Sequence, residues 1–480
     1  MRSTMLRFNP ANAHIVRFDG RAMLLHVPTT ALFELDELGC AVIEATADGG
    51  YFDRSGLPER LPGRFDGADV EAFVERLATL EIYQGADGRG AVNPRRAVVD
   101  AYPLSTIVLN VNTGCNLGCT YCYKEDLQRP ARGEKMSFEI AAQSVDLLLE
   151  QAAQRERVGV VFFGGEPLSN VPLIRRVVEH AERRGAETGK QIDFSLTTNA
   201  TLLTPQLVDF FDAHRFGLSI SIDGPQAIHD RNRRSVGGKG THAVVERKAA
   251  MLIGRYRSKP VGARVTLAAG TVEVEAIHAY LRGELGFHEV GYAPVTAAAD
   301  AAHALSAEQL DEVHAAFERL GEDYLEAALR GASNGFSNMH QLISDLHEGR
   351  RKALPCGAGV GLLAVDRSGG LNLCHRFTGS ELPTFGDVYG GIDTERLGEF
   401  LRRASDRDGT DCAKCRIRNL CAGGCYHEAY SRFGDPLHRT YHYCDLLRRW
   451  VDFGVRIYAE ISARNPRFFS THIDPRRTVA

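Results

Sequence analysis

NTGCNLGCTYCY, at residues 112–123, carries three cysteines directly after the apolar run 107–111, which predicts a buried strand. The cysteines are Cys115, Cys119 and Cys122. Thiolates are soft ligands, and C-x3-C-x2-C spacing lets one loop bring three of them to a metal cluster. Three thiolates leave one iron of a [4Fe–4S] cube open, whereas a structural zinc would need a fourth donor that the loop lacks. The bulky Tyr121 inside the motif suits a residue that packs over a bound cofactor.

Length and composition limit the classes of protein that the chain can belong to. With 480 residues it is expected to form two or three domains, and 44% hydrophobic and 25% charged residues are typical of a soluble globular protein. A net charge of -4 implies no basic face, so nucleic acid is not an expected partner. No apolar run has the length of a membrane span, and the N-terminus lacks a signal-peptide core. We therefore expect a cytoplasmic protein with no membrane partner.

Ten of the eleven cysteines fall into two groups, at residues 115–122 and 356–444. Disulfides are unstable in the cytoplasm, so clustered cysteines there indicate metal or redox chemistry. Cys40 stands apart in an apolar run and is interpreted as a core residue.

Strand and helix patterns alternate between about residues 105 and 295. Helical patterns separate six strand candidates, which predicts a parallel sheet, although periodicity alone allows either a partial barrel or a doubly wound sheet. The candidates are residues 107–111, 159–163, 193–196, 217–222, 263–267 and 289–293. Functional residues of such folds gather at the carboxyl ends of the strands.

Polar motifs follow several of these strands. Gly164-Gly165-Glu166-Pro167 follows the second, where paired glycines let backbone approach a ligand and the carboxylate can accept hydrogen bonds from an ammonium group. The third ends in Thr-Thr-Asn at 197–199. The fourth ends in Ser221-Ile-Asp223, whose hydroxyl and carboxylate can bind ribose hydroxyls.

With these motifs the chain resembles the radical S-adenosylmethionine (SAM) enzymes. The resemblance implies a partial (β/α)6 barrel over residues 104–305 and a cluster on Cys115, Cys119 and Cys122 whose open iron chelates the amino and carboxylate groups of SAM. In the family the Gly-Gly-Glu-Pro motif holds the SAM amino group, and the arginine of His-Asp-x-x-Arg, here Arg233, meets the carboxylate. The expected SAM contacts are Tyr121, Gly164, Gly165, Glu166, Ser221, Asp223 and Arg233, with Arg234 and Arg264 as further candidates.

Residues 1–95 read as a small α+β unit. A hairpin is expected around Asp19-Gly20, followed by helices at 30–47 and 69–80 and a strand at 82–83. The order and the Leu-Asp-Glu-Leu-Gly stretch resemble the winged-helix-like peptide-recognition domains fused to peptide-modifying enzymes. The resemblance implies that a leader peptide adds a strand to a sheet edge. The alternative is an N-terminal cap packed on the core. Residues 86–103 read as a linker, and 306–350 as a helical bridge.

The second cysteine group, within residues 351–480, resembles the SPASM extension of radical SAM peptide-modifying enzymes, which carries two auxiliary [4Fe–4S] clusters. The family's interleaved ligation gives cluster I Cys356, Cys374 and Cys425, and cluster II Cys412, Cys415, Cys421 and Cys444. Cluster I then lacks a fourth ligand, so an iron is open to a substrate thiolate. A zinc ribbon on Cys412, Cys415, Cys421 and Cys425 is the alternative, and it leaves three cysteines unexplained.

The resemblance implies a radical SAM enzyme that modifies a peptide or small protein subunit, bound through a leader segment, with flavodoxin or ferredoxin as electron donor. It is nearest to thioether-forming maturases, a group that includes the maturase of quinohemoprotein amine dehydrogenase. Those enzymes join a Cys sulfur to a carbon of another residue, such as Asp or Glu. The alternatives are a carbon–carbon cross-linking maturase, an anaerobic sulfatase-type maturase, and a non-enzymatic zinc or iron–sulfur protein.

One departure from the family pattern concerns the catalytic candidate. Sulfatase-maturating members carry a proton-accepting aspartate directly after the cysteine equivalent to Cys374, whereas His375 follows here. This argues against sulfatase maturation. His375 is a candidate base near neutral pH and equally a candidate hydrogen-bond donor beside the cluster.

Overall fold

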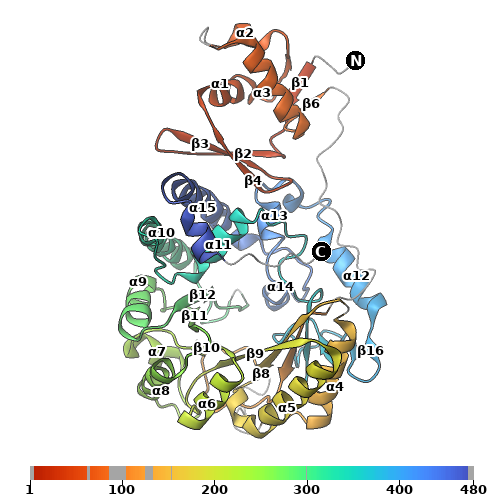
Figure 1. Ribbon diagram of the computed structural model, residues 1–480, viewed down its shortest axis with the longest axis vertical. Helices are drawn as coiled ribbons and strands as arrows, with labels where there is room; N and C mark the ends of the chain where they lie inside the picture. Colours follow the sequence, from red (N-terminus) through yellow and green to blue (C-terminus); the bar gives the residue numbers. More distant parts are fainter. Residues whose placement is uncertain are drawn as a thin grey trace.

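A computed structural model describes residues 5–61, 65–85, 104–124, 133–152, 154–298 and 300–473. The N-terminal module, residues 5–85, lies at one end of the long axis, and a large sheet flanked by helices lies at the other (Figure 1). Helices and loops of the C-terminal part lie between them. The expected linker at 86–103 lies outside the described residues.

The large sheet contains six parallel strands in sequential order: β7 (Thr106–Asn110), β8 (Arg157–Phe163), β9 (Gln191–Thr198), β10 (Gly217–Ser221), β11 (Val261–Leu267) and β12 (Glu289–Pro294). A doubly wound sheet would reverse its strand order, so the structure confirms the parallel α/β fold of a partial barrel. Beyond β7 the sheet continues with β13 (Leu362–Val365), parallel to β7, and β14 (Leu371–Asn372), antiparallel to β13. The C-terminal part of the chain thus extends the sheet.

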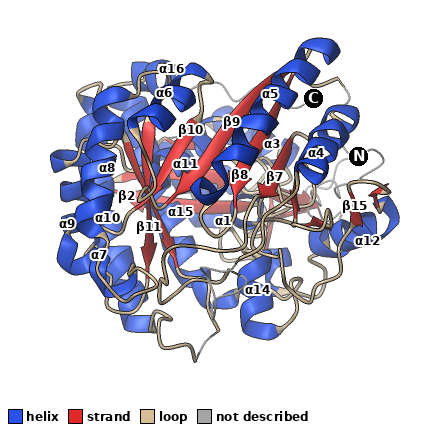
Figure 2. Cartoon of the chain, turned by 90° about the horizontal axis from the view of Figure 1, so that it is seen from below, coloured by secondary structure: helices blue, strands red, loops and turns tan. Residues whose placement is uncertain are grey.

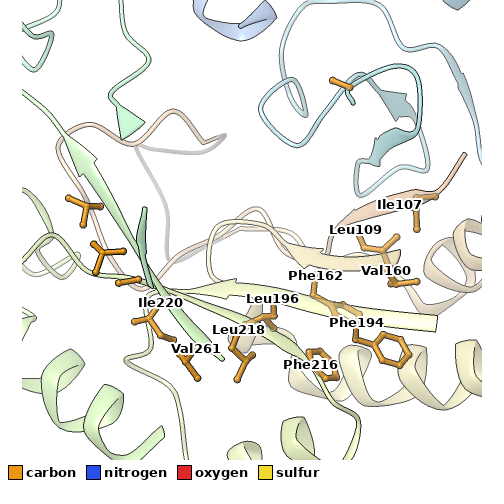
Figure 3. Packing of buried hydrophobic residues seen from close by; sticks show 14 of the residues in the cluster. Ile107, Leu109, Val160, Phe162, Phe194, Leu196, Phe216, Leu218, Ile220 and Val261 are labelled. Atoms are coloured by element: carbon orange, nitrogen blue, oxygen red, sulfur yellow. The ribbon is translucent and has the colours of Figure 1, made fainter. Parts of the chain in front are cut away.

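Alternation along the strands separates an apolar outer face from a polar inner one. Phe162, Phe194 and Leu218 are buried on the outer face, against the helices (Figure 3). Their neighbours Thr197 and Ser221 point inward, because successive side chains of a strand point to opposite faces. The inner face is therefore where a polar ligand can lie.

Helices cover the outer face of the sheet (Figure 2): α4 (Phe138–Gln151), α5 (Val171–Thr188), α6 (Pro205–Ala213), α8 (His242–Arg255) and α9 (Val274–His278), which continues as a π-helical turn at 279–284. The short α7 (Gln226–Asn232) follows β10. Ser137 and Thr204 cap α4 and α6 by accepting hydrogen bonds from backbone N–H groups three residues on, which fixes where both helices start.

The predicted helical segment 306–350 consists of α10 (Ala307–Leu329) and α11 (Ser337–His347). Both pack against the long α15 (Cys444–Arg464). The remaining C-terminal elements are short: a hairpin of β15 (Gly386–Asp387) and β16 (Gly391–Ile392), and helices α12 (Thr394–Ser405), α13 (Arg418–Cys421), α14 (Tyr426–Phe433) and α16 (Arg467–His472). None of the described helices combines the length and apolarity that crossing a bilayer requires.

The N-terminal module contains two antiparallel three-stranded sheets. One has the order β5 (Tyr51–Asp53), β1 (Met5–Phe8), β6 (Tyr83–Gly85), and the other β2 (Ala13–Phe18), β3 (Arg21–His26), β4 (Ala31–Leu35). Its helices are α1 (Glu37–Thr46), α2 (Leu57–Arg60) and α3 (Gly67–Thr79). The predicted hairpin is confirmed, with both turn residues, Asp19 and Gly20, at positive φ.

The predicted helix at 30–47 is wrong over its first third. Residues 31–35 form β4, which pairs with β3, and α1 begins only at Glu37. Asp36 caps α1 by accepting a hydrogen bond from the Gly39 N–H at 2.7 Å. Backbone pairing with a strand nearby in space overrides the helical spacing of the leucines.

Candidate functional site

A cavity of about 420 Å³ lies at the carboxyl ends of the barrel strands, and we call it the SAM cavity. One wall carries Cys115, Cys119 and Cys122, and residues at the strand ends form another. It brings together almost all the predicted contacts: Tyr121, Gly164, Gly165, Glu166, Ser221, Arg233, Arg264 and His375. The predicted contact Asp223 does not line it, and nor does the further candidate Arg234.

The cysteine loop is held by backbone hydrogen bonds from two sides. Gly118 N donates to Arg234 O at 2.8 Å, and Thr120 N donates to Asn232 O at 3.1 Å. From the other side, Gly165 N donates to Asn112 O at 2.7 Å. Motifs distant in the sequence thus fix the position of the three thiols.

The paired glycines were expected to lie against a ligand, but the atoms closest to them belong to the backbone of the cysteine loop. A Cβ on Gly164 would lie 2.3 Å from Asn112 O, and one on Gly165 would lie 2.2 Å from Gly114 O. The close approach that requires glycine is therefore to the backbone of the cysteine loop, and the motif fixes the thiols as well as lining the cavity.

Glu166 is 1% exposed and is oriented by hydrogen bonds to both carboxylate oxygens. Oε1 accepts from Thr198 Oγ1 at 2.6 Å and Leu168 N at 3.0 Å, and Oε2 accepts from Asn199 N at 2.9 Å. Burial raises its pKa, although these hydrogen bonds act in the opposite direction. A cationic ligand beside Glu166 would favour the ionised form.

Asp223 joins the cysteine loop to Arg233. Its Oδ2 accepts from the Tyr121 hydroxyl and lies 2.9 Å from Arg233 Nε, and its Oδ1 accepts from Thr266 N at 3.0 Å. Burial disfavours the charge on Arg233, but Asp223 and its other neighbours raise the net pKa. Asp223 is fully buried, so its carboxylate orients Arg233 and Tyr121.

The three thiols fit the thiolate ligands of an iron–sulfur cluster. Burial is the main cause that raises the pKa of Cys115 to about 12 and of Cys119 to about 11, and metal binding deprotonates such thiols. Leu117 N and Asn199 Nδ2 donate to Cys115 Sγ at 3.3 and 3.8 Å. Hydrogen bonds to the sulfurs are one means by which proteins tune a cluster.

The opposite end of the SAM cavity is formed by residues that follow Cys374. The His375 ring lies 4.2 Å from that of Phe163, and burial, followed by the charges of Lys124 and Arg376, lowers the pKa of His375 well below its ordinary value. His375 is therefore neutral at pH 7. The Arg376 guanidinium lies 4.6 Å above the ring of Tyr123, the residue directly after Cys122.

The C-terminal cysteines form two groups. Cys412, Cys415, Cys421 and Cys444 line one cavity, together with four arginines, Arg407, Arg418, Arg439 and Arg448. Burial, then the charges of Cys425 and Cys356, raise the pKa of Cys374 to about 11, so those three thiols lie near one another. This grouping separates Cys425 from Cys412, Cys415 and Cys421, the other three cysteines that a zinc ribbon would need. In the described parts of the chain, no three Cys, His, Asp or Glu side chains have the spacing of ligands to a single metal ion.

Residues 109–263 match the sequence model of the radical SAM superfamily. They span the cysteine loop, the Gly164–Pro167 motif and the residues that hold Arg233. This part of the chain therefore resembles the radical SAM superfamily.

Similar proteins extend this likeness over most of the chain. The cysteine-type anaerobic sulfatase-maturating enzyme of Clostridium perfringens is 24% identical over 379 residues, which are 73% of this chain and 96% of that enzyme. Seven further curated relatives match over 28 to 43% of their own length.

Two solved structures have the same fold. Native anSMEcpe with bound AdoMet superposes with a TM-score of 0.65 at 21% identity and covers 75% of this chain and 100% of its own. Streptococcus suis SuiB bound to precursor peptide SuiA superposes with a TM-score of 0.52 at 14% identity and covers 92% of this chain and 99% of its own.

Sequence reasoning missed several residues of the SAM cavity. Tyr123, Lys124 and Arg376 line it; Tyr123 follows Cys122, Lys124 is two positions after Cys122, and Arg376 is two positions after Cys374. Lys124 Nζ donates to His375 O at 2.9 Å. Closeness in sequence to the predicted cluster cysteines was the available signal, but the contact between Tyr123 and Arg376 could not be predicted from the sequence.

Proposed function

We propose that this protein is a radical SAM maturase that forms thioether cross-links in a peptide or small protein, from a Cys sulfur to a carbon of another residue such as Asp or Glu. The observation that carries the proposal is the wall of the SAM cavity made by His375 and Arg376. These residues follow Cys374, which lies near Cys356 and Cys425. A substrate held at those cysteines would adjoin the SAM cavity.

The chain's residues can bind and orient SAM in this cavity. Glu166 can accept hydrogen bonds from the amino group of SAM, and Arg233 and Arg264 can pair with its carboxylate. When bound, a [4Fe–4S] cluster and SAM supply a carbon-centred radical that abstracts hydrogen. The cavity keeps water away from that chemistry, since apolar side chains such as Phe163 and Val295 line it.

Thioether formation needs a thiolate, a hydrogen acceptor and an electron acceptor. The substrate carbon would lose one hydrogen atom, which bound SAM would accept as a radical, and the thiolate sulfur would bond to that carbon. One electron would be left over, and auxiliary clusters held by the seven C-terminal cysteines would accept it. Three cysteines, Cys356, Cys374 and Cys425, leave a coordination position for the substrate thiolate. A flavodoxin or ferredoxin supplies the electron that starts each cycle.

A peptide substrate is supported by the similar structures. SuiB was solved bound to precursor peptide SuiA, and anSMEcpe was solved with AdoMet and Cp18Cys peptide. The likeness to SuiB covers 92% of this chain and must therefore reach into the N-terminal module, whereas the 75% matched by anSMEcpe does not require the module. We assign leader binding to this module. Its β4 is an edge strand with Phe33 41% exposed, which suits strand addition.

Anaerobic sulfatase maturation is the second candidate, because the sulfatase-maturating relative matches over 96% of its length. That chemistry uses an acidic proton acceptor after the cysteine equivalent to Cys374. The chain has His375 there, and its lowered pKa makes it a weak base. We therefore rank thioether formation first.

The test is anaerobic co-expression with a small cysteine-bearing protein encoded beside this gene, followed by mass spectrometry. We expect a loss of two hydrogens per cross-link, with the cross-linked thiols no longer open to alkylation. The matched control is Cys115→Ala, which removes one cluster ligand of the SAM site and should give unmodified product.

Other outcomes would contradict the proposal in different ways. A loss of two hydrogens with every thiol still alkylated indicates carbon–carbon cross-linking. Conversion of a cysteine or serine of a co-expressed sulfatase to formylglycine indicates the second candidate. If the Cys115→Ala enzyme modifies the same fraction of the co-expressed protein as the wild type does, radical chemistry at this site is excluded.

A further inference from the structure

A second cavity, of about 440 Å³, adjoins the SAM cavity, and we call it the apolar cavity. Its walls come from the end of β12, from α10, α14 and α15, and from the loop after β14. The apolar side chains in its lining include Leu310, Val313, Phe317, Leu446, Leu447 and Trp450. Interiors are close-packed, and apolar cavities of this size are typical of ligand sites.

The apolar cavity adjoins the functional site on two sides. It shares Ala293, Pro294, Thr296 and Arg376 with the wall of the SAM cavity. It shares Thr440 and Leu447 with the cavity of the four-cysteine group. Cys425 also lines it, whereas Cys356 and Cys374 do not. A molecule in the apolar cavity therefore lies beside the expected cluster I and next to the SAM cavity without occupying the position of either.

Arg376 marks the junction of the two cavities. Its Nη1 donates to Thr296 Oγ1, and its guanidinium packs on the Tyr123 ring. Among the described residues, no carboxylate lies within ion-pair distance of it. Its remaining N–H groups can donate to main-chain carbonyls of a peptide that crosses from one cavity to the other.

We infer that the apolar cavity binds a bulky apolar side chain of the substrate peptide, next to its reacting cysteine. This rests on the proposed function, and it adds a recognition requirement that thioether chemistry alone does not impose. The aliphatic and aromatic walls favour Leu, Ile, Met or Phe over a small polar residue. The carboxylate in its lining, Glu428, is already paired with Arg432 at 2.8 Å, and Arg376 lies at the junction with the SAM cavity, so the apolar end of the cavity offers a charged ligand little.

Trp450 makes the inference measurable, since it is the single tryptophan of the chain and lines the apolar cavity. The probes are acetyl-Gly-Leu-Cys-Gly-amide and its Ser-for-Leu analogue, titrated anaerobically into the cluster-reconstituted protein. We expect the leucine peptide to change the Trp450 emission saturably, at a concentration at least about tenfold lower than the serine peptide. Equal responses to the two peptides, or no response to either, would overturn the inference.

A pair of variants on α10 separates the cavity from general stability. Val313→Phe fills the apolar cavity and should abolish the response to the leucine peptide. Leu325→Phe adds bulk to another buried position of the same helix, away from the cavity, and should retain the response. Retention of the response by a folded Val313→Phe protein would overturn the inference.

The co-expression experiment keeps the two proposals distinguishable. If the wild type cross-links its partner but Trp450 does not discriminate between the peptides, the inference fails and the proposed function stands. If Trp450 discriminates as expected but the partner is never modified, the pocket stands and the proposed function fails.

Discussion

Asp223 is a buried carboxylate that orients residues of the SAM cavity without lining the cavity itself. It accepts hydrogen bonds from Tyr121 and Thr266 and pairs with Arg233. The three partners come from the cysteine loop, from β11 and from the residue after α7. Because Arg233 is 7% exposed, its charge in this position depends on that of Asp223.

Replacing Asp223 by Asn should destabilise the protein and weaken SAM binding. The change keeps the shape but leaves a buried arginine without its counter-charge, which typically costs about 3–5 kcal/mol. Urea unfolding of the cluster-free protein measures the first effect, and isothermal titration of the reconstituted protein with SAM measures the second.

Tyr121→Phe is the matched control, because it removes a hydrogen bond from the same carboxylate and leaves the ion pair. It should cost about 1.5–3 kcal/mol. Equal stabilities of Asp223→Asn and wild type would contradict this account.

Most residues of the SAM cavity could be selected from the sequence because their signals are local. The spacing of Cys115, Cys119 and Cys122 lies within one loop, and Ser221 and Arg264 stand at or near predicted strand ends. The role of Asp223 could not be found in this way. It depends on a contact with Tyr121, 102 positions earlier, which exists only once β10 and the cysteine loop have met.

At the scale of elements, the loop after β8 and the cysteine loop after β7 form one unit. The backbone of 164–166 donates hydrogen bonds to the backbone of residues 112 and 114. Strand pairing brings the two loops together, since Asn110 of β7 is opposite Phe163 of β8. The glycines permit that approach. The sequence motif predicted that they line the cavity, but not that they make room for the cysteine loop.

Gly165→Ala should therefore displace the cysteine loop, although residue 165 makes no bond to iron. Its Cβ would lie 2.2 Å from Gly114 O, and backbone atoms cannot rotate away as a side chain can. We expect a loss of about 1–3 kcal/mol in the free energy of unfolding. Iron analysis after reconstitution should also show less iron bound at the SAM site. Gly118→Ala is the control in the same loop, where the nearest atom to the new Cβ is 3.9 Å away. Equal iron contents of the two variants would rule out the steric argument.

The error in the first third of the predicted helix at 30–47 also comes from contacts between elements. Leucines at helical spacing occur in both β4 and α1, and the boundary is set by Asp36. The pairing of β4 with β3 supplies backbone hydrogen bonds that no local pattern contains. Local periodicity predicted the six barrel strands well because helical segments separate successive strands along the chain.

At the scale of the whole molecule, the N-terminal module is joined to the loop that carries Cys415 and Cys421. Val16 and Met23 of its second sheet pack in one apolar cluster with Ile417, Leu420 and Val451. Figure 1 shows α13, which contains Leu420 and ends at Cys421, below the module. The module therefore packs against the loop that carries two cysteines of the four-cysteine group.

Two side chains of the loop that carries Cys415 and Cys421, which we call the cluster loop, donate hydrogen bonds to the N-terminal module at this junction. Arg418 Nη1 donates to Ala11 O at 2.6 Å, and Asn419 Nδ2 donates to Val27 O at 2.8 Å and Pro28 O at 3.1 Å. Asn419 is 1% exposed, so water cannot replace these bonds. The junction could not be predicted from the sequence, since its partners are about 390 positions apart.

Asn419→Ala should loosen both sides of the junction at once. Two buried carbonyls lose their donor, which costs about 1–3 kcal/mol. Hydrogen exchange of the cluster-free protein should then speed up in β3 and in residues 412–421 together. Asn465→Ala is the matched control, because it removes a similar bond, from Nδ2 to Ala328 O at 2.8 Å, away from the module. It should speed exchange near the end of α10 and leave β3 unchanged. Faster exchange in β3 alone, with residues 412–421 as protected as in the wild type, would mean that the module and the cluster loop open independently.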